Sequence, residues 1–413
     1  MRSISEEAFE MVKDYKGSHS GEHGDGIVRS EFHEMMFGKN ITNAFEEIKD
    51  TFDNKNLLNP GKIVRPFKSN DRSLMRYKSD YQTENISTHY DWSNWGQFSD
   101  AIEMCNNNGA CRKLDSGVMC PSYRVTKEEK DLVRGRANTL RLALSNQLPE
   151  GSFASKEMYE TMELCVSCKA CQRECPMSVD MAKMKSEFLS HYYKKFSMPI
   201  KDRVISDMPR LIWLLKIIAP TFNKVKNLPL ISTIVNKFGF ATERKMPEVQ
   251  SQDALKEIYN SQTVSENKVI LFADTFNINF ENKNLIYSIK VLNKFGYQAI
   301  IPSYGKDNLS RPLCCGRTYI SYGQLDKAAS ELNRFNDYIL ENNYYDLPVV
   351  GIEPSCLLTF NDEYLSLKNI NNREKIKNNF YLLEEFILDQ LKINTNIKTV
   401  SYTHLTLPTI GEV

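Results

Sequence analysis

The run Cys165-Val166-Ser167-Cys168-Lys169-Ala170-Cys171-Gln172-Arg173-Glu174-Cys175-Pro176 decides how the middle of the chain folds. Three cysteines at steps of three, followed by Cys-Pro, have the spacing of a 4Fe-4S site. Three thiolates this close can hold one corner of a cubane only if the backbone turns tightly, so a fourth thiolate comes from elsewhere. A structural zinc site is the alternative, but it usually pairs two distant Cys-x2-4-Cys hooks. The spacing therefore favours iron–sulfur.

A second, looser set of cysteines precedes this main run: Cys105, Cys111 and Cys120, which is followed by Pro121. In ferredoxins with two clusters, the cysteine before proline ligates the other cluster. We therefore expect Cys120 to complete the site of the main run and Cys175 to join Cys105 and Cys111. Because this second set has three cysteines, either a non-cysteine ligand fills its fourth place, or the second cluster is absent or labile. In the latter case Cys105 and Cys111 are buried thiols.

Composition limits the classes of protein to consider. The 413 residues suffice for two or three domains, and 41% hydrophobic with 25% charged residues indicates a globular protein. A net charge of +1 suggests no nucleic-acid partner. Ten cysteines, seven of them between Cys105 and Cys175, indicate a reducing, cytoplasmic compartment with local metal chemistry. The longest apolar stretch, Leu211 to Pro220, is too short to span a bilayer. It is a packed helix or an interfacial one in peripheral contact with the inner face of the membrane.

A glycine-rich segment near the start, Gly21-Glu22-His23-Gly24-Asp25-Gly26, places a carboxylate and an imidazole side by side. Glycines let a backbone approach a ligand closely. A histidine there can take a proton from a hydroxyl, and a glutamate can bind a metal. The same pattern is also typical of a plain turn.

The C-terminal part predicts a parallel α/β unit, because strands alternate with helices. Cys314 and Cys315 follow one predicted strand and Cys356 follows another, where α/β sheets place ligand sites. We expect strands over 269–273, 297–302 and 347–352, with helices over 284–295 and 326–342. Further helices are expected over 1–16, 127–145, 155–165 and 179–196, with Arg134 and Arg136 on a solvated face.

These elements predict an α+β protein of several domains. The predicted divisions are an N-terminal unit over 1–66, a linker over 67–95, an α-helical ferredoxin-like 4Fe-4S domain over 96–200, a helical connector over 201–267, an α/β domain over 268–395, and a non-native tail over 396–413.

Ser20 to Glu31, together with Asn59-Pro60-Gly61-Lys62, resembles the C-terminal portion of flavin-linked D-2-hydroxyacid dehydrogenases. Those enzymes oxidise D-2-hydroxyglutarate, D-lactate or glycolate. The resemblance implies that Glu22 helps hold a divalent metal such as zinc, and that His23 takes the hydroxyl proton as hydride passes to FAD. It also places Gly21, Gly24 and Asn59 near the cofactor. In that family the FAD-binding domain and two histidine metal ligands lie upstream.

Cys314-Cys315-Gly316 resembles the CCG domain of heterodisulfide-reductase-like and anaerobic glycerol-3-phosphate dehydrogenase subunits. There the cysteines bind further iron–sulfur centres or meet an electron partner. This chain departs from the pattern, because no cysteine lies near Asp274-Thr275-Phe276 and Cys356 lacks a partner three residues on. Partly exposed thiols in a degenerate site are the alternative.

The whole order, over roughly residues 1 to 395, resembles one fused FAD and iron–sulfur D-2-hydroxyacid dehydrogenase. Met119–Thr126, Arg134–Asn138 and Glu353–Cys356 carry that resemblance. Met1 is interpreted as an internal methionine and 400–409 as a translated adapter, so we expect an inactive piece of a longer enzyme. The implied partners are a small 2-hydroxyacid and an electron acceptor, namely a quinone, a cytochrome or an electron-transfer flavoprotein. A stand-alone iron–sulfur electron-transfer subunit and a metal-stabilised structural domain are the alternatives.

Overall fold

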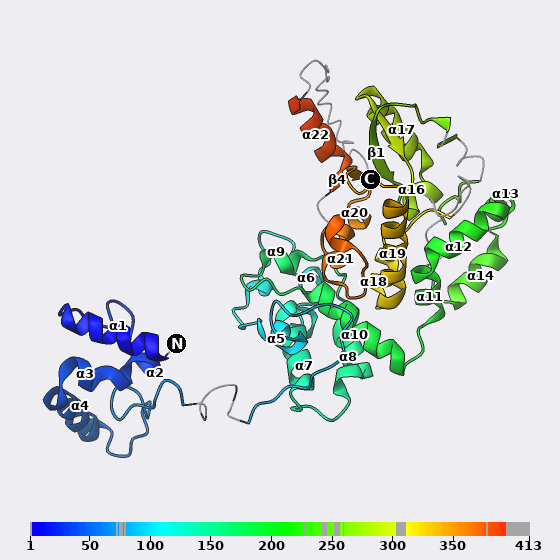
Figure 1. Ribbon diagram of the computed structural model, residues 1–413. Helices are drawn as coiled ribbons and strands as arrows, with labels where there is room; N and C mark the ends of the chain where they lie inside the picture. Colours follow the sequence, from blue (N-terminus) through cyan, green and yellow to red (C-terminus); the bar gives the residue numbers. More distant parts are fainter. Residues whose placement is uncertain are drawn as a thin grey trace, which may run out of the picture. The chain divides into compact units, whose positions relative to one another are not determined.

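The computed structural model divides the chain into two compact units, Met1–Gln82 and a second that begins at Thr83 (Figure 1). It describes residues 2–393 except 72, 74–76, 78–79, 227, 242–245, 252–256, 259, 303–310 and 377–378. The boundary falls inside the segment predicted as a linker. The tail predicted over 396–413 lies outside the described residues, as does part of the predicted connector. Each unit is described by itself.

The first unit is a small helical assembly. Phe9 packs on Phe32 with ring centroids 4.4 Å apart, and Phe32 is buried. Asp53 ends the last helix by accepting the backbone N–H groups of Leu57 and Leu58. The helices are α1 (Arg2–Asp14), α2 (Gly26–Arg29), α3 (His33–Phe37) and α4 (Lys39–Phe52).

The second unit begins with a helical part. Ser155 caps α8 and Asp180 caps α10, each through a side-chain oxygen that accepts a backbone N–H. The helices predicted over 155–165 and 179–196 are observed. The one predicted over 127–145 begins later, at Val133, after a short 3-10 turn over Glu129–Asp131. The helices are α5 (Phe98–Glu103), α6 (Pro121–Thr126), α7 (Val133–Leu144), α8 (Lys156–Glu163), α9 (Ala170–Glu174), α10 (Met181–Lys195), α11 (Ile200–Ser206), α12 (Met208–Leu215), α13 (Ala219–Val225) and α14 (Pro229–Lys237).

A four-stranded sheet follows, with strand order β2-β1-β3-β4 and every neighbouring pair parallel. The predicted parallel α/β arrangement is confirmed, and with it the α+β fold class. β4 was not predicted. The elements are β1 (Asn267–Phe272), α16 (Thr275–Asn279), α17 (Asn282–Lys294), β2 (Tyr297–Ile300), α18 (Arg317–Ser321), α19 (Leu325–Glu341), β3 (Val349–Gly351), α20 (Pro354–Asn361), α21 (Glu363–Ser366), β4 (Phe380–Leu382) and α22 (Leu383–Ile393).

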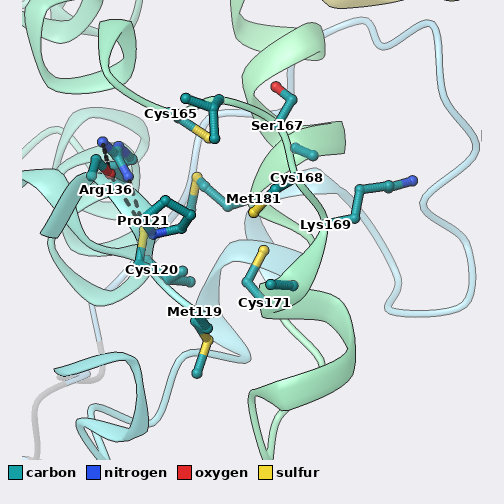
Figure 2. A pocket seen from close by; sticks show the side chains of 15 residues that line it. Met119, Cys120, Pro121, Arg136, Cys165, Ser167, Cys168, Lys169, Cys171 and Met181 are labelled. Carbon is teal, nitrogen blue, oxygen red and sulfur yellow. Dashed lines mark hydrogen bonds between the residues drawn. The ribbon is translucent and has the colours of Figure 1, made fainter. Parts of the chain in front are cut away.

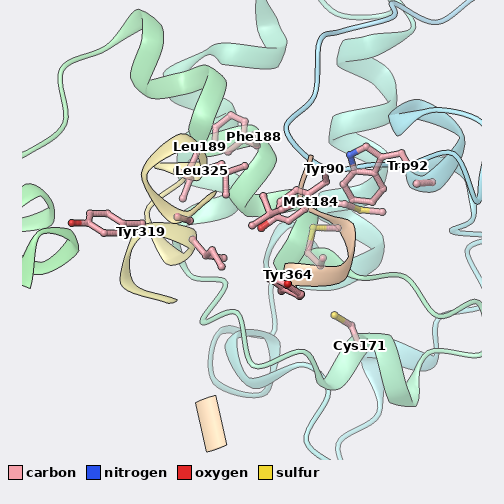
Figure 3. Packing of buried hydrophobic residues seen from close by; sticks show 14 of the residues in the cluster. Tyr90, Trp92, Cys171, Met184, Phe188, Leu189, Tyr319, Leu325 and Tyr364 are labelled. Atoms are coloured by element: carbon pink, nitrogen blue, oxygen red, sulfur yellow. The ribbon is translucent and has the colours of Figure 1, made fainter. Parts of the chain in front are cut away.

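One hydrophobic core runs through the helical part and one face of the sheet, so the two parts pack as a single body. Leu189 of α10 and Leu325 of α19 both belong to it (Figure 3). Gly323, just before α19, lies directly against α10, since a Cβ at this position would lie 2.5 Å from the Cβ of Leu189. Its φ of +68 also favours glycine. The cysteine-rich helices are therefore held against the sheet by packed side chains.

Residues 83–95 also pack onto this body. The buried carboxylate of Glu187 on α10 accepts the backbone N–H groups of His89 and Tyr90. Burial alone would raise the pKa of Glu187, but hydrogen bonds from the side chain and backbone of His89 and from the backbone of Tyr90 lower it below its usual value. Tyr90 pairs with Leu367 through an isolated antiparallel bridge, so the segment connects α10 with the end of α21.

The apolar stretch from Leu211 to Pro220 forms α12 and the turn after it. Ile212 and Ala219 are buried, so part of the stretch packs as predicted. Leu214 and Ile217 are 63% and 70% exposed. Among the residues that the structure describes, no helix combines the length and apolarity needed to cross a membrane.

Candidate functional site

Four cysteines from two separate segments line one cavity (Figure 2). Cys165 and Cys168 come from the loop that leads into α9, Cys171 lies in the first turn of α9, and Cys120 immediately precedes α6. Cys120 and Cys171 are buried, Cys165 is half-buried and Cys168 is exposed. Cys175 does not line this cavity. The structure thus places Cys120 beside the first three cysteines of the main run.

The backbone turns around these sulfurs with two residues in the left-handed region. Ser167 has φ 53 and Lys169 has φ 61, which bends the loop on either side of Cys168. The Ala170 N–H donates to the Cys168 sulfur, and the Met181 N–H, at the start of α10, donates to the Cys171 sulfur. Backbone N–H groups aimed at sulfur stabilise negative charge on a cluster.

Arg136 on α7 supplies a buried positive charge to the same cavity. Its Nη1 lies 3.7 Å from Cys120 Sγ, and its Nε donates to the Thr161 carbonyl at 2.9 Å. Its exposed fraction is 0%, so the expectation of a solvated Arg136 is wrong. The preceding residue, Gly135, lets α7 lie close to the turn over Glu129–Asp131, because a Cβ at position 135 would lie 1.9 Å from the Glu129 carbonyl oxygen. Sequence reasoning missed Arg136, whose burial no sequence pattern shows.

These residues fit a 4Fe-4S cluster. Four soft sulfur ligands, two N–H donors and one guanidinium surround a single cavity. Burial raises the pKa of Cys171 to about 12, so its thiol stays protonated unless a metal compensates the thiolate charge. The chemistry of the site is therefore that of a metal centre.

Cys105 and Cys111 lie in a neighbouring loop, and Cys175 lies at the end of α9. Burial raises the pKa of Cys111, and the nearby Cys105 adds to that effect. The Arg134 N–H, in the first turn of α7, donates to the Cys111 sulfur. Cys175 follows α9, which packs on the 3-10 turn that contains Cys111.

Cys314, Cys315 and Cys356 come together at the carboxyl ends of β1 and β3. The Cys314 sulfur accepts the Gly316 N–H at 3.4 Å, and Cys315 hydrogen-bonds Cys356. Hydrogen bonding to Cys315 and burial raise the pKa of the Cys314 thiol. All three side chains are buried, so the alternative of partly exposed thiols is wrong as far as exposure is concerned. Thr275 Oγ1, 3.7 Å from Cys314 Sγ, stands where the resemblance leads one to expect a cysteine.

The glycine-rich segment of the first unit is exposed. The side chains of Glu22 and His23 are 90% and 79% exposed, with 3.7 Å between Oε1 and Nε2. A Cβ on Gly21 or Gly24 would have no neighbour within 4 Å. Asn59 is exposed as well and has φ 47. Nothing within the described part of this unit covers these side chains.

A different group in this unit has the donor set of a metal site: His19, Asp25 and His33. His33 Nδ1 faces the Ile63 carbonyl at 3.2 Å and Nε2 faces Asp25 Oδ2 at 2.9 Å. Both ring nitrogens of the buried His19 have no hydrogen-bond partner among the described residues. Burial lowers the pKa of His19, which keeps its imidazole neutral. A divalent ion fits this group by its chemistry.

Two known families match parts of the chain. Residues 1–63 match the C-terminal domain of FAD linked oxidases, and residues 101–179 match the 4Fe-4S dicluster domain. The second match contains both cysteine sets. Together the matches support FAD and an iron–sulfur cluster as cofactors.

Curated relatives match most of the chain. It is 27% identical to a D-2-hydroxyglutarate dehydrogenase of Pantoea ananatis, covering 88% of this chain and 39% of that protein. It is 24% identical to one of Escherichia coli, covering 97% and 42%. A glycolate oxidase subunit GlcD of Bacillus subtilis is 39% identical over 57 residues, which is 14% of this chain and 12% of that protein. The chain thus spans about two fifths of the length of the dehydrogenases it matches. No solved structure matches it.

Proposed function

We propose that this chain carries electrons away from a flavin that oxidises a D-2-hydroxyacid. The first carrier is a 4Fe-4S cluster held by Cys120, Cys165, Cys168 and Cys171. The proposal rests on one observation: these four cysteines come from two segments and line one cavity beside a buried arginine. The dehydrogenase names of the relatives support the substrate class.

When bound, such a cluster carries one electron at a time. The residues of this chain set how easily the electron is accepted. The Ala170 and Met181 N–H groups and the Arg136 guanidinium all place positive charge near the sulfurs, which favours the reduced state. Burial of Cys120 and Cys171 limits the access of water.

At the substrate end, His23 takes the proton of the substrate hydroxyl and Glu22 helps hold a divalent metal such as zinc. FAD, when bound, accepts the hydride. The exposure of Glu22 and His23 fits residues that receive a substrate and a cofactor bound mainly by other parts of a longer protein. The electron acceptor is a quinone, a cytochrome or an electron-transfer flavoprotein. A cytoplasmic location, with peripheral contact at the inner face of the membrane, fits the ten cysteines, which the described structure does not join in disulfides, and the exposed Leu214 and Ile217.

Anaerobic reconstitution of the chain with iron and sulfide tests the electron-transfer half. We expect a brown protein whose visible absorbance bleaches on addition of dithionite, and whose content of iron and sulfide is equal. A colourless product that binds zinc would contradict it and would favour a metal-stabilised structural domain.

The hydroxyacid half needs a protein that also carries the FAD-binding portion. There, His23→Asn should abolish flavin reduction by D-2-hydroxyglutarate while dithionite still reduces the cluster. If this substitution leaves substrate-dependent reduction intact, the alternative is favoured, namely an iron–sulfur subunit without a catalytic histidine. Cys314, Cys315 and Cys356 lie together in one buried site, and this observation supports the alternative of an iron–sulfur subunit.

A further inference from the structure

The loop that contains Cys105 and Cys111 repeats the main cysteine run in sequence. Ile102-Glu103-Met104-Cys105 corresponds to Met162-Glu163-Leu164-Cys165, and Gly109-Ala110-Cys111 corresponds to Lys169-Ala170-Cys171. Both loops therefore have cysteines at their first and seventh positions. At the fourth position, the main run has Cys168 and the earlier loop has Asn108.

The two loops also share a backbone conformation. Asn107 and Gly109 have φ 64 and 78, as Ser167 and Lys169 have φ 53 and 61. A positive φ is uncommon for residues other than glycine. Because both loops have a positive φ at their third and fifth positions, the similarity of their backbones is specific. Each loop starts and ends with equivalent turns. At the start, the Cys105 N–H donates to the Ile102 carbonyl, and the Cys165 N–H donates to the Met162 carbonyl. At the end, the Arg112 N–H donates to the Gly109 carbonyl, and the Gln172 N–H donates to the Lys169 carbonyl.

Asn108 takes over the contact that Cys168 makes in the main run. Asn108 Oδ1 accepts the Ala110 N–H at 2.8 Å, just as the Cys168 sulfur accepts the Ala170 N–H. The cysteines at the seventh position correspond too, since Cys111 receives an N–H from the first turn of α7 and Cys171 one from the first turn of α10. The Asn108 side-chain oxygen thus occupies the place of a ligand atom.

An arginine of α7 lies beside each cysteine loop: Arg134 beside the loop of Cys105 and Cys111, and Arg136 beside the main run. Arg134 Nη1 lies 3.4 Å from the Asn107 carbonyl, and its charge acts on both Cys105 and Cys111. Arg134 and Arg136 lie two residues apart on α7, so one helix directs a guanidinium to each cysteine set. A negatively charged cluster is favoured at both places.

We propose that Cys105, Cys111 and Cys175 bind a second iron–sulfur cluster in which Asn108 faces an iron that has no thiolate. That iron is exchangeable, because an amide oxygen is a weak, hard ligand for a cluster iron. Loss of the iron as Fe²⁺ from a 4Fe-4S cluster of charge 2+ leaves a neutral 3Fe-4S core, so no electron needs to leave and no oxidant is consumed. The proposal concerns a site apart from the main cluster and does not depend on the hydroxyacid chemistry.

Native mass spectrometry of the anaerobically reconstituted full chain tests this directly. We expect two clusters, and a brief treatment with a chelator should remove one iron from the wild-type protein. Asn108→Cys supplies the missing thiolate and should abolish that loss. Ser116→Cys, at an exposed side chain five residues after Cys111, adds a thiol that does not stand at a ligand position; it serves as the matched control and should behave as wild type.

Isotopically labelled Fe²⁺ adds a second readout that does not depend on folding differences between variants. One labelled iron should enter the wild-type protein, and Mössbauer spectroscopy should report it in an oxygen-ligated environment. Cys175→Ala should remove the second cluster and leave the main one. The proposal is overturned if the wild type holds one cluster only, or if Asn108→Cys loses the labile iron as readily as wild type. In either case the main cluster would still be present, so the two proposals fail separately.

Discussion

Lys169 Nζ lies 3.0 Å from Glu363 Oε1. Lys169 stands between Cys168 and Cys171, and Glu363 begins α21 in the α/β part. The same carboxylate oxygen pairs with Arg317, which follows Cys315 by two residues. Glu363 is 3% exposed. One buried carboxylate therefore connects the loop of the main cysteine run with the loop of the Cys314–Cys315 pair.

Glu363→Gln should destabilise the second unit, because it leaves two cations near one neutral amide. Removing one partner of a buried ion pair typically costs about 3–5 kcal/mol. Asp362, which also pairs with Lys169, offsets part of that cost, so we expect a loss of roughly 2 kcal/mol. Urea unfolding followed by circular dichroism measures it. Glu374→Gln, at a side chain that is 74% exposed, should leave the midpoint unchanged, and equal effects for both variants would contradict this role.

Arg136→Gln should make the main cluster harder to reduce. The substitution removes a buried positive charge 3.7 Å from Cys120 Sγ and leaves Asp131, 3.9 Å from Arg136 Nη2, without its cation. We expect the midpoint potential to fall by roughly 60 mV, which is a tenfold change in a one-electron equilibrium. A redox titration followed by visible absorbance gives this value.

Two variants separate charge from structure in that experiment. Arg136→Lys keeps the positive charge and should show a much smaller shift. Arg134→Gln changes the neighbouring arginine, which pairs with Glu129 at the other cysteine set, and should leave the potential of the main cluster nearly unchanged. If Arg134→Gln and Arg136→Gln shift the midpoint potential of the main cluster equally, the contact of Arg136 with Cys120 has no special effect on that potential.

Lys216 predicts a pH dependence of stability. Burial lowers its pKa to about 7, and its Nζ donates to the Ile278 carbonyl at 3.0 Å. Because the unfolded chain keeps this amine protonated up to its ordinary pKa, the unfolded state binds more protons between pH about 7 and about 10. The free energy of unfolding should therefore rise with pH across that window, by up to about 1.4 kcal/mol per unit.

Lys216→Met should remove this dependence. The variant should be more stable than wild type at pH 7, and the difference should shrink as pH approaches 10. Urea unfolding at a series of pH values measures both curves. Lys224→Met, at an exposed side chain two turns away, is the matched control and should keep the wild-type slope. A wild-type stability that is flat from pH 7 to 10 would show that Lys216 is not held neutral.

The sequence predicted the parts of the site that depend on spacing alone. The steps of three in the main run indicated a cluster, and the shared Cys-Pro ending pointed to Cys120, which the structure brings to the same cavity. The strands over 269–273 and 347–352 were visible because their apolar runs are buried on both faces. β4, only three residues long, carries too short a pattern to be recognised.

What the sequence did not reveal depends on burial and on backbone conformation. Arginine is usually a surface residue, and the burial of Arg136 depends on tertiary packing that a sequence pattern does not show. Asn108 is one of three consecutive asparagines, so the sequence alone does not distinguish it from its neighbours. The positive φ values on both sides of Asn108 match those on both sides of Cys168, and this match identifies its position. His19, Asp25 and His33 follow no regular spacing, and only the fold of this segment brings their side chains together.

The electron-transfer proposal depends on Cys120 being the fourth ligand of the main cluster, and substitution of the two Cys-Pro cysteines distinguishes Cys120 from Cys175. Each of Cys120→Ala and Cys175→Ala would be reconstituted anaerobically, and the dithionite-reduced protein examined by electron paramagnetic resonance alongside iron and sulfide analysis. We expect Cys120→Ala to lose the signal of the main cluster and Cys175→Ala to retain it. Retention in Cys120→Ala together with loss in Cys175→Ala would rule out Cys120 as the fourth ligand, because the main run would then hold its cluster with its own four cysteines.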